Sequence, residues 1–283
     1  MPLNMKTQKM SDKQIQYIET PSGRLAYRVD GSPDAEPLLL IQRFRGVIDQ
    51  WDPEFVEKLA AHRRVIRFDS AGVGRSEGDA PPTVTATAEI ALEFLDALKI
   101  DVIDVFGWSL GGYVGQAMAL RSPARVRRLV IAGSGPGGVT DGAKRHPRVN
   151  EIALKESIDD EDYLFLFFAD SETSRAAGRA YLARVAAEND GPATKMPSVM
   201  NQLKAIVNWT NGGDAARPRL KELSMPILVA NGVTDVMVPT YGSFVISQEA
   251  PNAKLVLYPD SGHGFLFQHI EDFTQEVLAF LSA

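Results

Sequence analysis

The sequence contains no cysteine, which excludes disulfide bonds, thiolate metal sites and cysteine nucleophiles. It also lacks long apolar runs: the longest aliphatic stretch, "LLLI" at 38–41, is far too short to span a bilayer, and the polar start has no signal-peptide core. Lysines and arginines are scattered along a chain of net charge −6, so we expect no basic surface for nucleic acid. No cluster of histidine, aspartate and glutamate has metal-ligand spacing. These absences predict a soluble, cytoplasmic protein with no metal site, no membrane or nucleic-acid partner, and disorder in its first dozen residues.

Short apolar runs alternate with amphipathic segments along most of the 283 residues. Helices are expected from Pro53, over 83–98, from Ser109 and at the C-terminus, where apolar residues recur at helical spacing. This alternation predicts a mostly parallel sheet that is covered by helices on both faces. The expected strands are 24–29, 37–42, 64–69, 102–107, 126–133, 226–231 and 254–259.

The alternation is interrupted between residues 136 and 215, where we find no convincing strand. The strongest helical stretch there, 159–187, begins with acidic residues and carries arginines towards its end, an order that complements the dipole of one helix or of two. The sequence therefore predicts an α/β core formed by 1–135 and 216–283, and an all-helical cap formed by 136–215.

A serine flanked by glycines lies where one expected strand ends and a helix begins, in the stretch "GWSLGG" at 107–112. A turn this sharp strains the backbone of Ser109 and exposes its hydroxyl at the edge of the sheet. Glycines two residues before and after it avoid the clash that a β-carbon would cause. The pattern alone also fits a glycine-rich turn with a helix-capping serine. A nucleophilic serine additionally needs a base and an orienting acid.

Candidates for both partners follow Ser109, each just after an expected strand. Asp235 lies in "GVTDVMVP", and His263 in "DSGHGF" is the only one of the four histidines in a short glycine-flanked loop after a strand. Asp260 and Asp141 are alternative acids, but Asp260 is too near His263 along the chain and Asp141 lies within the helical segment. We therefore predict Ser109 as nucleophile, His263 as base and Asp235 as acid.

These motifs resemble those of the α/β-hydrolase-fold family, in particular of lidded serine esterases and lactonases. The resemblance is carried by "GWSLGG", "GVTDVMVP", "DSGHGF" and the turn "FDSAGVGRS", and it extends over residues 13–283. It implies an eight-stranded sheet with an antiparallel second strand and a site at the carboxyl edge of that sheet. It also implies a catalytic triad of Ser109, His263 and Asp235 that works without a cofactor.

The resemblance further implies two backbone N–H donors for an oxyanion, on Leu110 and on Phe44. The family's usual His-Gly pair before the second donor is replaced here by Gln42 and Arg43. The N–H group survives such a replacement, but Arg43 adopts the backbone conformations of glycine less readily. A guanidinium near the pocket would bind a substrate carboxylate. We favour the other interpretation at this point, in which Arg43 faces solvent or pairs with a local acid.

Two further features concern the substrate pocket. Trp108, beside the nucleophile, is expected either to form a wall of the pocket or to pack in the core. The apolar run "YLFLFF" at 163–168 would line an acyl pocket, although burial in the core of the cap is the default interpretation.

The combined observations predict a serine hydrolase that acts on a small carboxylic ester or lactone. Cofactor-free perhydrolases of the haloperoxidase type and carbon–carbon bond hydrolases use the same triad and are alternatives. A non-catalytic ligand-binding receptor of the same fold is an alternative of a different class. A serine at 109 disfavours dehalogenases and epoxide hydrolases, whose nucleophile is aspartate.

A covalent serine probe distinguishes the enzyme from the receptor. We expect a fluorophosphonate to label the wild-type protein and not the Ser109→Ala variant, because only an activated hydroxyl attacks phosphorus readily. Labelling is measured by intact-protein mass spectrometry. Wild-type labelling no greater than that of the variant would contradict the enzyme prediction.

Overall fold

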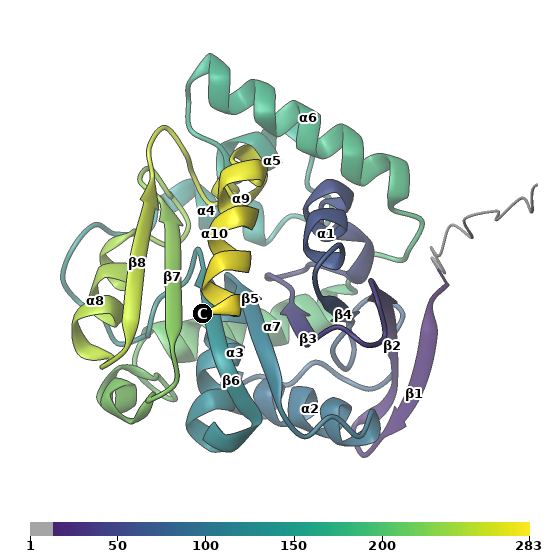
Figure 1. Cartoon of the computed structure of the whole chain (residues 1–283). Coiled ribbons are helices and arrows are strands. Elements are labelled where there is room, and N and C mark those ends of the chain that lie inside the picture. Colours follow the sequence, from purple (N-terminus) through teal and green to yellow (C-terminus); the bar gives the residue numbers. More distant parts are fainter. Residues whose placement is uncertain (1–13) are drawn as a thin grey trace, which may run out of the picture.

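One eight-stranded sheet organises the structure, a computed structural model that describes residues 14–283 (Figure 1). The strand order is β1-β2-β4-β3-β5-β6-β7-β8. β2 is antiparallel to β1 and β4, and the other neighbouring pairs are parallel, so the implied eight strands and antiparallel second strand are confirmed. The strands are β1 (Gln16–Thr20), β2 (Gly23–Asp30), β3 (Pro37–Ile41), β4 (Arg64–Phe68), β5 (Ile103–Trp108), β6 (Val126–Ala132), β7 (Ile227–Gly232) and β8 (Ala253–Tyr258).

The seven strands expected from apolar runs are β2 to β8, each within one residue at either end. β1 is the strand that the sequence did not predict. It lies at the edge of the sheet and pairs only with β2, and none of its five residues is buried. An edge strand with so little burial carries no hydrophobic pattern, which explains why it was missed.

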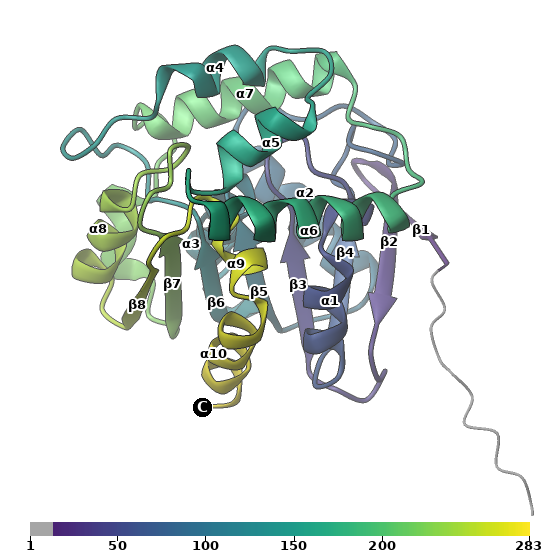
Figure 2. The ribbon, with the colours of Figure 1, turned by 90° about the horizontal axis from the view of Figure 1, so that it is seen from above.

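Helices cover both faces of the sheet (Figures 1 and 2), as predicted. The residues of β3 alternate between two hydrophobic cores: Leu39 packs into the core beneath α2 and α3, whereas Leu38 and Leu40 pack into the core beneath α1 and α10. A strand buried on both faces therefore appears in the sequence as a continuous apolar run. The core helices are α1 (Pro53–Ala60), α2 (Val84–Ala97), α3 (Leu110–Arg121), α8 (Tyr241–Glu249), α9 (Phe265–Gln268) and α10 (Ile270–Ser282).

Four α-helices lie between β6 and β7 and cover the carboxyl ends of the parallel strands (Figure 2). The stretch 159–187 forms two of them, because Asp159 caps one helix through Asp162 N and Ser171 caps the next through Ser174 N. The helical character predicted for 136–215 is present, while the division of the chain at 135 and 215 stays a prediction. The helices are α4 (Pro147–Ala153), α5 (Asp160–Phe167), α6 (Glu172–Glu188) and α7 (Met196–Thr210).

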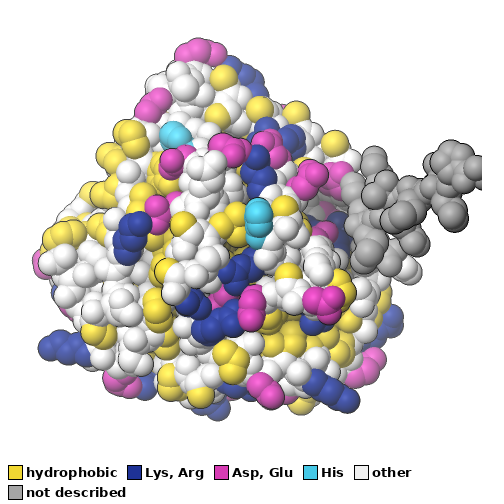
Figure 3. Space-filling model, in the orientation of Figure 1, with side chains coloured by type: hydrophobic (Ala, Val, Ile, Leu, Met, Phe, Trp, Pro, Cys, Tyr) yellow, Lys and Arg dark blue, Asp and Glu magenta, His cyan; other side chains and the backbone are white. Residues whose placement is uncertain are grey.

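The surface carries charges of both signs, and acidic and basic side chains are interspersed on the face in Figure 3. Within residues 14–283, no helix has the length and apolar character needed to cross a membrane. The disorder predicted for the first dozen residues concerns a segment that lies outside the described part of the chain.

Asp69, directly after β4, connects two loops at the carboxyl edge of the sheet. Its side chain is buried, with Oδ1 accepting from the N–H of Ile48 at 2.8 Å and Oδ2 from the N–H of Arg75 at 2.9 Å. Burial raises the pKa of Asp69 from its ordinary value of 3.8 to about 6. The carboxyl therefore holds the loop after β3 against the "FDSAGVGRS" turn, and it binds its proton more tightly in the folded chain than in the unfolded one.

We expect the contribution of Asp69 to the free energy of unfolding to decrease by about 2–3 kcal/mol as pH rises from about 4 to 6. In that window the folded state holds more protons than the unfolded state, so raising the pH favours unfolding. Urea titrations at each pH give the free energy of unfolding of the wild type and of Asp69→Asn, whose side chain at position 69 cannot titrate. The difference between the two free energies is the quantity to follow. A difference that does not change between pH 4 and 7 would contradict the assignment.

Candidate active site

Ser109 occupies the sharp turn between β5 and α3. Its backbone has φ 59° and ψ −117°, a conformation that a residue with a side chain rarely adopts. A β-carbon on Gly107 would lie 2.2 Å from the carbonyl oxygen of Gly111, and one on Gly111 would lie 2.0 Å from the carbonyl oxygen of Ile41. The two glycines thus permit a strained turn that brings the start of α3 against the end of β3.

His263 and Asp235, in loops after β8 and β7, form a buried pair. The imidazole Nδ1 lies 2.7 Å from Asp235 Oδ2, and both side chains are fully buried. The other carboxylate oxygen accepts from the backbone N–H groups of Met237 and Val238 at 2.8 and 2.9 Å. Because Nδ1 donates to the carboxylate, Nε2 is the nitrogen free to accept a proton. Nε2 has no hydrogen-bond partner among residues 14–283.

The imidazole and the serine turn meet above the end of β6. A β-carbon on Gly133 would lie 3.1 Å from the imidazole, and the N–H of Ser109 donates to Ala132 O at 2.8 Å. Trp108 Nε1 donates to the carbonyl oxygen of His263 at 3.1 Å. In the described chain Ser109 Oγ and His263 Nε2 form no hydrogen bond, and such catalytic bonds commonly tighten only when substrate is bound.

The other histidines and the alternative acids lie elsewhere. His146 caps α4 and His269 Nε2 lies 2.7 Å from Ser261 Oγ, while His62 is exposed after α1. The carboxylate of Asp260 accepts from a serine of the cap, and Asp141 is exposed. Of the candidates weighed from the sequence, the structure brings His263 and Asp235 into contact.

The two predicted oxyanion donors lie on adjoining segments, since Gly111 packs against the last residue of β3. The N–H of Leu110 belongs to the first turn of α3, where N–H groups have no acceptor inside the helix. The N–H of Phe44 donates to no acceptor in the described part of the chain. Both groups are therefore available to a ligand.

The replacement of His-Gly by Gln42 and Arg43 places no left-handed conformation on Arg43. Gln42 Oε1 accepts from the N–H of Arg43 at 2.9 Å, and Gln42 Nε2 donates to Val47 O at 3.2 Å. The left-handed conformation falls on Arg45, with φ 62°, instead of on Arg43. The Gln42 side chain thus determines the shape of this loop.

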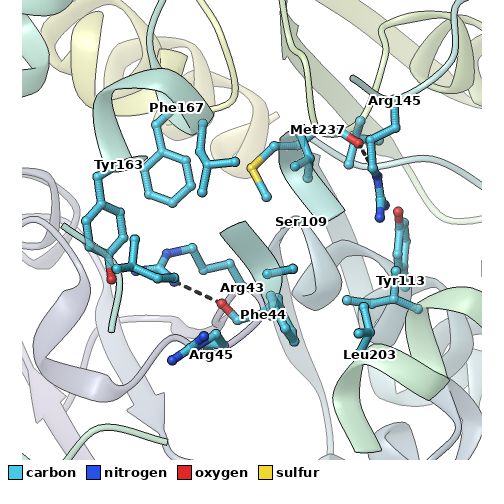
Figure 4. Close-up of a pocket in the computed structure, with 16 residues that line it drawn as sticks. Arg43, Phe44, Arg45, Ser109, Tyr113, Arg145, Tyr163, Phe167, Leu203 and Met237 are labelled. Atoms are coloured by element: carbon cyan, nitrogen blue, oxygen red, sulfur yellow. Dashed lines mark hydrogen bonds between the residues drawn. The ribbon is translucent and has the colours of Figure 1, made fainter. Parts of the chain in front are cut away.

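A pocket opens above Ser109, beneath the cap helices (Figure 4). Tyr163 and Phe167 lie on one side of it, and Tyr113 and Arg145 on the other. Among the described residues, no Asp or Glu lines this pocket, and no group of three His, Asp or Glu is arranged to hold a metal ion. The lining residues are Arg43, Phe44, Arg45, Ser109, Tyr113, Arg145, Val149, Ala153, Ile158, Tyr163, Leu166, Phe167, Leu203, Ile206, Met237 and Val238.

The favoured interpretation of Arg43 is wrong, and of the two interpretations of Trp108 the structure shows core packing. Arg43 neither faces solvent nor pairs with an acid: it is 6% exposed, and no ion pair involves it within residues 14–283. Trp108 does not form a wall of the pocket. It is fully buried behind the pocket, with its ring against those of His263 and Phe167, and its indole N–H donates to the backbone of the histidine loop.

The run 163–168 serves both purposes weighed for it: Tyr163, Leu166 and Phe167 line the pocket, whereas Leu164 is buried within the cap. Tyr113 is a pocket residue that the sequence analysis missed. Its position one helical turn after Ser109 was the available signal, because residues four apart share a helix face. Arg145, in an irregular loop, had no such signal.

Comparisons with known proteins agree with this architecture. Residues 36–270 match a family model described as alpha/beta hydrolase fold. The chain is 29% identical over 91% of its length to a putative carbamate hydrolase RutD from Caulobacter sp. (strain K31), 96% of which is covered. It is 29% identical over 92% of its length to a pimeloyl-[acyl-carrier protein] methyl ester esterase from Pectobacterium atrosepticum, 99% of which is covered.

Among solved structures, an alpha/beta hydrolase fold protein from Chitinophaga pinensis superposes with a TM-score of 0.86 at 36% identity. The match covers 95% of this chain and 97% of the other. The similarity therefore extends through the core and the cap.

The packing of Gly111 against β3 gives a test of the serine turn. We expect Gly111→Ala to lower the free energy of unfolding by about 1–3 kcal/mol or more, since its β-carbon would meet the fixed backbone at Ile41. Gly115→Ala in the same helix is the control, because the added carbon meets no backbone atom and only side-chain methyl groups, Leu129 Cδ1 at 2.9 Å and Val105 Cγ1 at 3.3 Å. Urea unfolding measures both variants. Equal losses would contradict the close approach.

Proposed function

The chain belongs to the alpha/beta hydrolase fold family, and we propose that it is a serine hydrolase that cleaves a small carboxylic ester or lactone. One observation carries the proposal: an imidazole held by a buried carboxylate at 2.7 Å, with its Nε2 unpaired, lies beside the strained turn of Ser109. The resemblance to an esterase supports the ester as substrate.

In the proposed reaction, His263 Nε2 removes the proton of Ser109 Oγ as the oxygen attacks the substrate carbonyl. The protonated imidazole then donates that proton to the departing alkoxide, which leaves an acyl group on Ser109. A water molecule, activated by the same nitrogen, attacks the acyl-enzyme and releases the acid. Asp235 accepts from Nδ1 throughout, so it fixes the tautomer and stabilises the imidazolium.

Negative charge develops on the carbonyl oxygen in both steps, where the N–H groups of Leu110 and Phe44 are proposed to stabilise it. Such fixed donors act strongly in a site that excludes water, and the loss of one typically lowers the rate by about 10²–10³-fold. Leu110 also lies at the N-terminus of α3, where the helix dipole favours an anion.

A carbamate is a second candidate substrate, because a relative of 29% identity is named a putative carbamate hydrolase. A carbamate carbonyl is attacked through the same tetrahedral intermediate, so the proposed residues keep their roles. A panel of neutral esters, lactones and carbamates of graded length distinguishes the candidates by their kcat/KM values. Perhydrolase and carbon–carbon hydrolase chemistry remain alternatives on the same residues.

We expect Ser109→Ala and His263→Ala each to lower kcat on the best panel substrate by at least about 10³-fold. The double variant should lose no more than either single variant, because the two residues act as one unit. His62→Ala is the control, since that side chain is exposed after α1. Losses that multiply in the double variant, or turnover that survives either substitution, would contradict the mechanism.

A further inference from the structure

Arg43 carries a buried positive charge without a counterion. Four arginines of the described chain are less than a tenth exposed: Arg28, Arg43, Arg63 and Arg67. Three of them pair with an aspartate, namely Asp49, Asp104 and Asp30 respectively. Arg43 has no such partner in residues 14–283. A buried charge is unfavourable unless it is paired, so this exception calls for an explanation.

The contacts of Arg43 hold its guanidinium in place but do not neutralise it. Nη1 donates to Phe44 O at 2.9 Å and Nη2 donates to Gln50 Oε1 at 3.1 Å. The guanidinium carbon lies 5.1–5.6 Å from the ring centres of Trp108, Tyr163 and Phe167, which favours a cation. Nε, although buried, has no acceptor in the described chain.

The two acids closest in sequence to Gln50, which binds Arg43, are paired with other arginines. Asp49 pairs with Arg28 and Arg75, and Asp52 with Arg184. Neither carboxylate forms an ion pair with Arg43. A negative charge for Arg43 is thus lacking among residues 14–283, and the pocket is where a ligand can bring one.

The composition of the pocket also favours a negatively charged ligand. Arg43 lines it together with Arg45 and Arg145, which also have no ion-pair partner within residues 14–283, and no acidic side chain lines it (Figure 4). The remaining surface is mostly apolar. An anion with a short apolar spacer matches such a cavity, because the low dielectric strengthens its attraction to the guanidinium.

We infer that the substrate carries a carboxylate, which the guanidinium of Arg43 binds while the reacting carbonyl lies at Ser109. The inference rests on the proposed function and narrows its substrate class to anionic esters or lactones. Nε–H is a donor without an acceptor in the described chain, and a planar guanidinium matches a carboxylate in a bidentate manner. Since Nη1 holds the carbonyl of Phe44, the anion site adjoins the proposed oxyanion donor.

The test compares esters that differ in charge. p-Nitrophenyl butyrate is neutral, p-nitrophenyl hemiglutarate carries the carboxylate on the acyl side, and 4-butyryloxybenzoate carries it on the leaving group. The quantity compared is kcat/KM for an anionic ester divided by kcat/KM for the neutral ester. For at least one of the two anionic esters, we expect Arg43→Met to lower this ratio by about 10–100-fold. Arg43→Lys keeps the positive charge but lacks the planar, bidentate guanidinium, so it should recover part of that ratio.

Arg145→Gln is the matched control, because it removes another arginine of the pocket whose Nε donates to Met237 O. A ratio that depends on Arg145 and not on Arg43 would overturn the inference. So would equal losses of kcat/KM on neutral and anionic esters in Arg43→Met, which would mean that Arg43 only supports the loop of Phe44.

A binding measurement separates this inference from the proposed function. In Ser109→Ala, calorimetry with monomethyl glutarate should show binding that weakens about 10–100-fold when Arg43→Met is added. Binding that depends on Arg43, with no ester hydrolysed by the wild type, would reject the proposed function and keep the anion site. Hydrolysis that depends on Ser109, with no effect of Arg43 on either measurement, would reject the anion site alone.

Discussion

The close backbone contact between the start of α3 and the ends of β3 and β5 is the constraint on which the site depends. Gly107 and Gly111 allow it, and Ser109 adopts a strained conformation because the chain must reverse within a few residues. The same contact brings the loop after β3 beside the first turn of α3. The proposed nucleophile and the two proposed N–H donors are thereby brought together from segments far apart in the sequence.

The histidine is held by a second set of close contacts at the same edge. Gly232, at the end of β7, packs against the carbonyl oxygens of Ser261 and Gly262, so that the loops after β7 and β8 run together. The cap contributes as well, because Phe167 O accepts from the N–H of Gly264 next to the histidine. Phe167 also lines the pocket, so the same helical segment shapes the pocket and supports the proposed base.

The loop after β3 accommodates Gln42 and Arg43 in place of the family's usual His-Gly. Gln42 supplies hydrogen bonds that shape the loop. The next position holds a long cationic side chain with three aromatic rings around it. The departure from the family pattern is thus compatible with the fold, and it changes the charge of the pocket.

The sequence by itself determined the strands β2 to β8, the helical interruption and the order of serine, aspartate and histidine, because burial periodicity and turn chemistry are local properties. It did not reveal β1, whose residues are too exposed to carry a pattern. Only the tertiary structure decided that Arg43 is buried without an acid and that Trp108 lies behind the pocket. It also placed Tyr113 and Arg145 on the side of the pocket opposite Tyr163 and Phe167. Those properties depend on which distant segments meet, and a side chain's burial and partners are set by neighbours that its own sequence context does not contain.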